Sequence, residues 1–393
     1  MSAPLATIGW ALAALAGAGI GYAGVAGLLV QRFFRDAGPG FDGAVNGEGA
    51  TILKPLHRVE PGLDRRLEGV FVQVDDQPFQ IVFGSDRADD PALEIVRGLA
   101  EAYPERAVLI AADSNLHGQN RKVSNIINMM SQLEAQGQWR ASQSDAIIVL
   151  SDSDIGVGPD YLRRIRQALA APGVGVVTCP YFGAAEAGFW SGHVAMGISY
   201  QFLPSVVVGA MSGAAQPCMG STIALRRTTL ERIGGFDAFR DILADDYAIG
   251  AAVRELGLTS VVAPVLVSHC CSETTFKALM AHELRWARTV MGVQPAGYLG
   301  SIVTHPLPLA LLAALSLGFS PASLSLVAAS FAVRVWLMSR VDRAIGRRLG
   351  PWWLTPMRDT LSFVVFVGAF FVGSVAWRGV KYRVTTNGNL KPV

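Results

Sequence analysis

A chain of 393 residues has room for two or three domains at about 150 residues each. Hydrophobic residues make up 51% of it and charged residues only 16%, which excludes a disordered chain or a strongly charged nucleic-acid-binding protein, so we expect no nucleic-acid partner. The net charge of +2 hides a basic C-terminal region, because ten Lys and Arg but only two acidic residues follow from Arg334 onward. This asymmetry is typical of segments at the cytoplasmic face of a membrane. The four cysteines have no CxxC spacing, which favours a reducing compartment.

The N-terminal segment is apolar. Met1 to Val30 carries no charged side chain and is long enough to cross a bilayer. A cleaved signal peptide is disfavoured, because the positive charges of Arg32 and Arg35 follow the apolar run instead of preceding it. We therefore predict a transmembrane helix over residues 1–35 and a Gly-rich linker over 36–49. By the positive-inside rule, the domain that follows lies in the cytoplasm.

Between residues 50 and 300, short apolar runs alternate with helical patterns. This alternation predicts an α/β domain with a mostly parallel sheet, helices on both faces, and ligands at the carboxyl ends of the strands. The predicted strands are 51–54, 80–83, 107–111, 146–150, 174–179, 221–225 and 260–265. The predicted helices are 63–74, 91–102, 122–136, 160–170, 246–256 and 273–291.

Three further apolar stretches indicate contact with a membrane. The segment 190–215 contains one ionisable side chain, His193, and is interrupted by Pro204. It predicts an interfacial or lipid-facing segment, the alternative being an ordinary buried helix and loop. Residues 301–338 contain three prolines and predict a tight hairpin or two short spans, and 361–376 predicts a re-entrant or interfacial stretch. We assign 301–393 to a C-terminal membrane region with basic cytoplasmic loops.

The strongest local motif is Ser151-Asp152-Ser153-Asp154, directly after the apolar run 147–150. Side chains alternate along a strand, so both aspartates are expected on the same side where the buried strand ends. Two carboxylates there suit a hard divalent cation that neutralises the phosphates of a ligand. A turn or helix-capping role before Pro159 is the alternative.

Other polar motifs allow two interpretations each. Asp245-Asp246 either caps the helix that it opens or provides a base that accepts a proton from a hydroxyl nucleophile. His282, Arg285 and Trp286 share one helix face, which either binds a pyrophosphate or rests on a membrane surface.

Two motifs near the predicted strands are also ambiguous. Asp90 lies in Asp89-Asp90-Pro91 and either contacts a base or ribose or caps the next helix. Lys122 either contacts a phosphate or belongs to a solvated helix face.

Together, these motifs resemble those of a processive-type GT-A glycosyltransferase. They are most similar to the ceramide glucosyltransferase family and its bacterial relatives in hopanoid biosynthesis. The similarity extends from residue 50 to residue 304 and includes the tail. The matching stretches are Ile52-Leu53-Lys54-Pro55-Leu56, Asp89-Asp90-Pro91, Asn120-Arg121-Lys122-Val123-Ser124-Asn125, Ser151-Asp152-Ser153-Asp154, Asp245-Asp246-Tyr247, Arg285-Trp286, Trp377-Arg378-Gly379 and Tyr382-Arg383-Val384.

The resemblance implies a role for individual residues. Asp90 is expected near the uridine, Asp152 at the metal and the diphosphate with Asp154 assisting, and Asp246 as the general base. Asp245 belongs to the same motif as Asp246, and His282 stands where the family has Gln or Arg. The residues expected to bind the nucleotide sugar are Pro55, Asp90, Lys122, Asp152, Arg285 and Trp286.

The resemblance also implies an activity. It is an inverting transfer from a UDP-sugar to a membrane lipid hydroxyl, with a divalent cation, Mg²⁺ or Mn²⁺. The motifs look most like the hopanoid branch, which implies transfer of N-acetylglucosamine from UDP-GlcNAc to a bacteriohopanetetrol-type lipid. Glucosylation of ceramide is the alternative, and a processive polysaccharide synthase is disfavoured because the C-terminal membrane region is short. We expect an integral protein of the bacterial inner membrane whose catalytic domain faces the cytoplasm.

Overall fold

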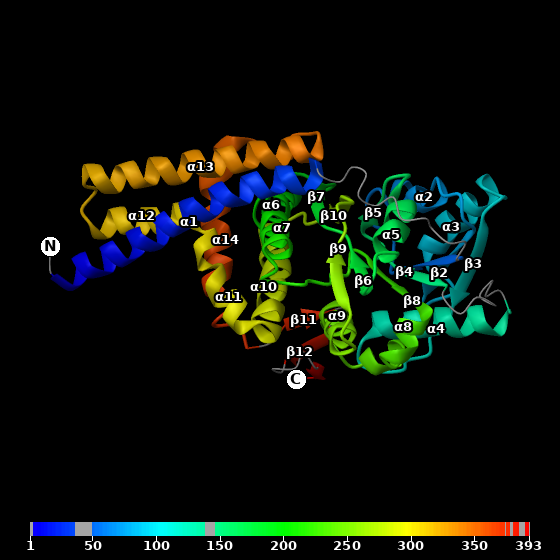
Figure 1. Cartoon of the computed structure of the whole chain (residues 1–393). Coiled ribbons are helices and arrows are strands. Elements are labelled where there is room, and N and C mark those ends of the chain that lie inside the picture. The colour runs from blue at the N-terminus through cyan, green and yellow to red at the C-terminus, as the bar shows by residue number, and fades with distance from the viewer. Residues whose placement is uncertain are drawn as a thin grey trace.

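The computed structural model describes residues 3–35, 49–137, 146–373, 375–377, 380–384 and 390–392. Apart from residue 49, the expected linker 36–49 lies outside the described residues. Figure 1 shows an α/β domain from which long helices extend to one side. In this extension, α1 (Ala3–Arg35) packs against α12 (Pro306–Ser316) and α13 (Pro321–Ile345).

The α/β domain is built on a seven-stranded sheet in which the predicted strands all appear. In spatial order, its strands are β3 (Ala107–Ala112), β2 (Phe79–Ser85), β1 (Ala50–Pro55), β4 (Ile147–Leu150), β8 (Ile223–Arg226), β6 (Val174–Thr178) and β9 (Thr259–Val262). Within this described sheet, β8 alone runs antiparallel to its neighbours. The prediction of a mostly parallel sheet is confirmed.

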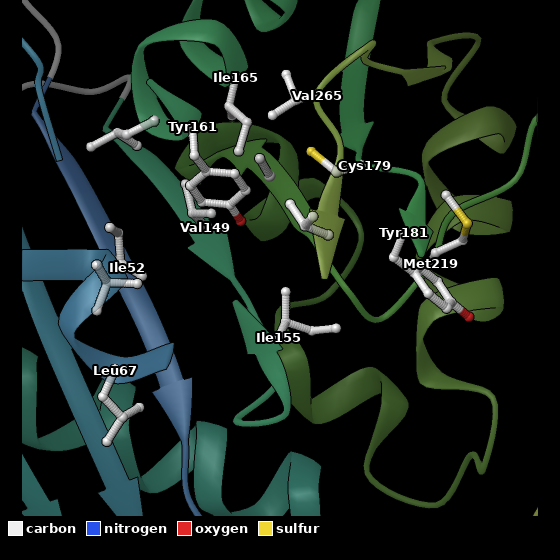
Figure 2. Packing of buried hydrophobic residues seen from close by; sticks show 14 of the residues in the cluster. Ile52, Leu67, Val149, Ile155, Tyr161, Ile165, Cys179, Tyr181, Met219 and Val265 are labelled. Atoms are coloured by element: carbon white, nitrogen blue, oxygen red, sulfur yellow. The ribbon is translucent and has the colours of Figure 1, made fainter. Parts of the chain in front are cut away.

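Helices cover both faces of this sheet. They are α2 (Leu63–Phe71), α3 (Pro91–Ala102) and α5 (Tyr161–Leu169) on one face, and α4 (Arg121–Ala135) and α9 (Asp245–Glu255) on the other. Because side chains alternate along a strand, each central strand contributes to two cores. Ile52 and Val149 belong to the first core, which Figure 2 shows, whereas Leu53 and Leu150 belong to the second. Short helices α8 (Arg227–Arg232) and η2 (Phe236–Phe239) follow β8.

A second sheet was not predicted. It has three strands in the order β5 (Ile155–Gly156), β10 (Val267–Cys271) and β7 (Tyr181–Ala185). β10 pairs antiparallel with β5 and parallel with β7. Since β5 follows β4 after one turn, this sheet brings β10 to the carboxyl end of β4.

A third sheet contains β11 (Val375–Trp377), β12 (Val380–Val384) and β13 (Leu390–Pro392). The motif Tyr382-Arg383-Val384 lies in β12, whereas residues 378 and 379 of the Trp-Arg-Gly motif lie outside the described part of the chain.

Three described helices are long and apolar enough to cross a membrane: Pro4–Arg35, Phe189–Ser212 and Pro321–Ile345. Counting a bent pair as one broken span adds a fourth, which combines Pro295–Thr304 with Pro306–Ser316 at an angle of 69°. This pair includes α11 (Pro295–Gly300) and η3 (Ser301–Thr304). α12 and α13 pack against each other as a hairpin, in the region where the sequence predicted a tight hairpin or two short spans. After them come η4 (Trp352–Leu354) and the shorter α14 (Thr355–Gly368).

The segment 190–215 is less broken than predicted. α6 (Phe189–Gly197), the π-helix η1 (Ile198–Phe202) and α7 (Leu203–Ser212) follow one another without a gap. Pro204 comes directly after the π-helical turn, where the pattern of backbone hydrogen bonds already changes, so it does not end the helix. The run packs against α1, α14 and α10 (Phe276–Val293).

Candidate active site

The turn after β4 carries the acidic pair of the strongest sequence motif. The strand ends at Leu150, so Asp152 and Asp154 lie in the turn and not in the strand itself. Strand alternation therefore does not set the directions of their side chains, contrary to the reasoning from the sequence. Asp152 faces Lys122, and Asp154 faces His269.

Lys54 of β1 fixes this turn. Its fully buried ammonium group donates hydrogen bonds to Ser151 Oγ (3.1 Å) and to the backbone oxygens of Asp152 (2.6 Å) and Ile155 (2.8 Å). Each of its three N–H groups therefore has an acceptor. Sequence reasoning placed Lys54 in a matching motif but selected its neighbour Pro55 as the site residue. The signal of Lys54 was a charged residue in a mainly apolar strand.

Lys122 connects the two acidic motifs. Asn120 caps α4 by accepting hydrogen bonds from the backbone N–H groups of Lys122 (3.0 Å) and Val123 (3.1 Å). Lys122 Nζ then lies 2.8 Å from Asp152 Oδ1 and 3.2 Å from Asp245 Oδ2. Burial opposes the charged form, but the two carboxylates raise the pKa of Lys122 above its ordinary value. Lys122 is therefore a fixed positive charge between two acids.

Asp246 meets these groups at Gly220. Its Oδ2 accepts a hydrogen bond from the Gly220 N–H (2.9 Å), and its Oδ1 accepts one from the Tyr247 N–H (2.7 Å). A Cβ atom added to Gly220 would lie 3.0 Å from Asp152 Oδ2, 3.5 Å from Lys122 Nζ and 3.6 Å from Asp246 Oδ2. These three side chains therefore surround one point of the backbone.

The acidic pair that opens α9 is engaged in the site. The N-cap residue Ala244 offers no side-chain hydrogen bond to the helix, but Asp246 Oδ1 binds the Tyr247 N–H in its first turn. Asp245 and Asp246 also reach beyond the helix, to Lys122 and Gly220. Burial raises the pKa of Asp246 to about 6, with Asp245 adding to the shift and Lys122 opposing it. A carboxylate with such a pKa is a stronger proton acceptor than an ordinary aspartate.

His269 and Tyr181 belong to the unpredicted sheet, and neither was among the predicted site residues. His269 Nε2 lies 3.3 Å from Asp154 Oδ2, and its ring stacks on Tyr181 at 5.5 Å between centroids. Burial raises the pKa of Asp154, but His269, Lys54 and Lys122 together lower it below the ordinary value. The sequence signal was the ionisable His269 in the otherwise mainly apolar run 265–271.

α10 directs the expected residues toward the same region. The rings of His282 and Trp286 meet edge to face at 4.4 Å, and His282 is hydrogen-bonded to Glu273. The side chain of Arg285 makes no hydrogen bond or ion pair with any residue that the structure describes. Burial lowers the pKa of Arg285, while the nearby charges of Asp154 and Glu273 oppose this shift. Arg285 is thus a cation with donors to spare beside the acidic turn.

Asp90 lies at the same edge of the sheet but contacts other groups. Its Oδ1 accepts from the Ala92 N–H (3.0 Å) and caps α3, and its Oδ2 accepts from Ser85 Oγ (2.8 Å) and from the Arg58 N–H (3.2 Å). Pro55 ends the adjacent parallel strand. The capping function of Asp90 is present, and contacts of Asp90 and Pro55 with a nucleotide stay predictions.

Asp152 and Asp154 have the chemistry of cation ligands. Carboxylate oxygens are what hard divalent cations prefer, and Asp154 Oδ1 is buried without a hydrogen-bond partner among the described residues. The described chain contains no group of three or more His, Cys, Asp or Glu side chains that could hold a metal ion. A cation at this turn would therefore need additional oxygen ligands from a diphosphate or water.

A mostly parallel sheet covered on both faces, with two acids in the turn after a central strand, is the arrangement of the GT-A fold. A mannosyltransferase from Pyrobaculum calidifontis, solved in complex with GDP-Man and Mn²⁺, has this fold. It aligns with a TM-score of 0.51 and 20% identity, covering 93% of this chain and 99% of that chain. The predicted fold class is confirmed.

The sequence comparison narrows the class to a family. The model of glycosyl transferase family 21 matches residues 12–390, and the chain belongs to this family. Ceramide glucosyltransferase 1 of Caenorhabditis elegans is 21% identical over 365 residues, covering 87% of this chain and 73% of that protein. The ceramide glucosyltransferase of Komagataella phaffii is 30% identical over 126 residues, covering 31% of this chain and 23% of that protein. The predicted family and the expected enzyme class, a glycosyltransferase, are confirmed.

Proposed function

We propose that this glycosyltransferase is anchored in a membrane and transfers a sugar from a UDP-sugar to a lipid hydroxyl with inversion of configuration. The observation that carries the proposal is the meeting of Asp152, Lys122 and Asp246 around Gly220. Such a transfer needs fixed positive charge beside a diphosphate and a base beside the acceptor hydroxyl. The domain that holds these groups packs directly against apolar helices, and the names of the two ceramide glucosyltransferases support a lipid acceptor.

Lys122 and Arg285 are the positively charged side chains of the protein that interact with the diphosphate. Arg285 has no protein partner among the described residues, and a guanidinium group can bind two phosphate oxygens at once. A divalent cation, Mg²⁺ or Mn²⁺, held by Asp152 and Asp154 would neutralise the charge on the departing diphosphate. The Mn²⁺ in the similar mannosyltransferase supports a cation of this kind.

Asp246 acts as the general base. It removes the proton of the acceptor hydroxyl while the hydroxyl oxygen bonds to the anomeric carbon, and the bond from that carbon to the diphosphate breaks on the opposite side. One displacement inverts the configuration. The backbone N–H groups of Gly220 and Tyr247 hold the carboxylate in place. Trp286 provides an apolar wall beside the polar groups.

For the substrates, the motif resemblance favours UDP-GlcNAc as donor and a bacteriohopanetetrol-type hopanoid as acceptor. The names of the relatives favour UDP-glucose and ceramide as the second candidate. We also propose that residues 1–35 span the bacterial inner membrane, that the catalytic domain 50–300 faces the cytoplasm, and that 190–215 and 301–393 contact the lipid. The basic residues after α13 support this orientation.

Mass spectrometry of lipids from cells with and without the protein tests the proposal. We expect a hexosamine-linked hopanoid to be missing from cells that lack the protein. Purified protein with UDP-GlcNAc should form this lipid again when added to the lipid extract of those cells. Loss of a hexosyl-ceramide would select the second candidate instead. Loss of a long polymer, or of no lipid at all, would contradict transfer to a single lipid hydroxyl.

A further inference from the structure

α10 carries Arg285 and Trp286. Leu279 is the one residue of this helix that is fully buried, and the half-buried Met280 and Trp286 pack against the core of the α/β domain. Directional polar contacts add to this packing in setting which way Arg285 points. One of them caps the helix, since Thr275 Oγ1 accepts from the Ala278 N–H (3.1 Å).

Besides the hydrogen bond of His282 with Glu273, α10 has an ion pair on the side away from Arg285. Glu283 and Arg285 are two positions apart, which places them about 200° apart around the helix axis. Both carboxylate oxygens of Glu283 accept hydrogen bonds from Arg358 of α14, each at 2.7 Å. This bidentate geometry fixes direction as well as distance.

Arg358 is itself fully satisfied. Its five N–H donors reach Glu283, the His193 backbone oxygen (2.9 Å) and Ser362 Oγ (2.8 and 3.1 Å). Its side chain is only 4% exposed. Gly197 leaves room for it, because an added Cβ would lie 3.3 Å from Arg358 Cζ. One guanidinium group thus joins α6, α10 and α14, which meet beside the α/β domain in Figure 1.

α10 also contacts the acidic turn. Trp286 lies three positions after Glu283, about 60° from it around the helix axis. It meets His269 edge to face at 5.4 Å, and His269 holds Asp154 at 3.3 Å. A rotation of α10 that released Glu283 would therefore move Trp286 and Arg285 relative to Asp154.

We propose that Glu283 and Arg358 are positioning residues of the transferase. They lock α10 to the C-terminal helix α14, so that Arg285 and Trp286 face the diphosphate. This inference rests on the proposed function, and it makes the reactivity of the site depend on a helix of the C-terminal region. Neither Glu283 nor Arg358 needs to touch a substrate for this effect.

The test uses full-length protein with Glu283→Gln, which keeps the size of the side chain, and Arg358→Lys, which keeps the charge but loses the bidentate contact. We expect the kcat/KM for the UDP-sugar to fall about 100-fold in Glu283→Gln, as for a misplaced catalytic group. In a protein that already carries Trp286→Ala and Arg285→Ala, adding Glu283→Gln should lower kcat/KM only slightly further, because the side chains that Glu283 positions are gone. Arg358→Lys answers the same question if Glu283→Gln does not fold.

Hydrogen exchange of the α10 backbone amides gives a second readout that needs no substrate. Residues 276–293 should exchange faster in Glu283→Gln than in wild type, while α4 should not change. This outcome would stand even if the UDP-sugar or the lipid acceptor were wrong, so the two proposals can fail separately. Wild-type exchange in α10 together with wild-type kinetics would overturn the positioning inference.

A matched control separates positioning from stability. Arg166 and Asp75 form another buried ion pair, at 2.9 Å, which joins α5 to the segment before β2 and lies away from the site. Replacing them together by Arg166→Gln and Asp75→Asn should lower the thermal stability but leave the kcat/KM of the folded protein unchanged. An equal loss of kcat/KM in this control and in Glu283→Gln would show that general destabilisation, not the position of α10, is responsible.

Discussion

The ammonium group of Lys122 lies 2.8 Å from the carboxylate of Asp152 and joins the first turn of α4 to the turn after β4. These residues are far apart in the chain, yet each sits where a secondary-structure element begins or ends. The same ammonium reaches Asp245 at 3.2 Å. Lys122 therefore offsets negative charge that would otherwise repel a diphosphate at this edge of the sheet.

Replacing Lys122 should weaken the use of the donor. We expect Lys122→Met to lower kcat/KM for the UDP-sugar about 30-fold, which corresponds to about 2 kcal/mol for a lost charge-assisted contact. Steady-state kinetics at varied donor concentration measures this, and the KM should rise. Arg121→Met is the control. The Arg121 side chain is half exposed and its ion pair with Asp86 is long, at 3.9 Å, so the kinetics of this variant should match wild type. An unchanged KM in Lys122→Met would contradict a phosphate contact.

The rate of transfer should depend on pH through Asp246. Burial raises the pKa of this group to about 6, and only its ionised form can accept a proton. The rate should therefore fall as the pH decreases through about 6 and level off above it. A pH–rate profile on both sides of this value measures the effect.

Substitution identifies the group that titrates. Asp246→Asn should reduce turnover by about 10²- to 10⁴-fold and remove the acid limb, while UDP binding persists. Glu255→Gln, at the exposed end of the same helix, should leave the profile unchanged. If Asp246→Asn retained its turnover, Asp246 would not be the base.

Removal of divalent cations should abolish transfer, and Mn²⁺ or Mg²⁺ should restore it. Asp154→Asn should raise the Mn²⁺ concentration needed for half-maximal activity, because it removes a ligand. His269→Gln should raise this concentration about tenfold, because His269 orients the Asp154 carboxylate. Activity titrated against added Mn²⁺ after chelation gives these values. Full activity in excess chelator would refute the proposed role of both aspartates.

Local sequence patterns predicted the large sheet because each of its strands is a short apolar run between turn residues. The second sheet escaped prediction for physical reasons. β5 has only two residues, and β10 contains polar side chains that pair with groups from distant segments. His269 and Tyr181 were therefore missed although they lie beside the acidic turn.

The residues whose contacts assemble the site are also far apart in the chain. Glu283 and Arg358 are 75 positions apart, and nothing in either local sequence indicates the other. The motif resemblance selected Asp152 and Asp246, but only the fold shows that both approach Gly220. Ion pairs of this kind depend on how helices pack, which periodicity alone does not determine.

The last prediction concerns Gly220 itself. A methyl group at this position would lie 3.0 Å from Asp152 Oδ2, closer than nine in ten real contacts of a Cβ atom, and would stand between the three groups of the site. Gly220→Ala should therefore lower kcat about tenfold or more, as expected when reacting groups are displaced by a fraction of an ångström. The control is Gly98→Ala in the exposed part of α3, where an added Cβ meets no atom within 4 Å. This variant should gain about 1 kcal/mol of helix stability and keep its activity. The two variants are compared by kcat and by thermal unfolding. A Gly220→Ala protein as active as Gly98→Ala would show that the reaction does not take place in the space around Gly220.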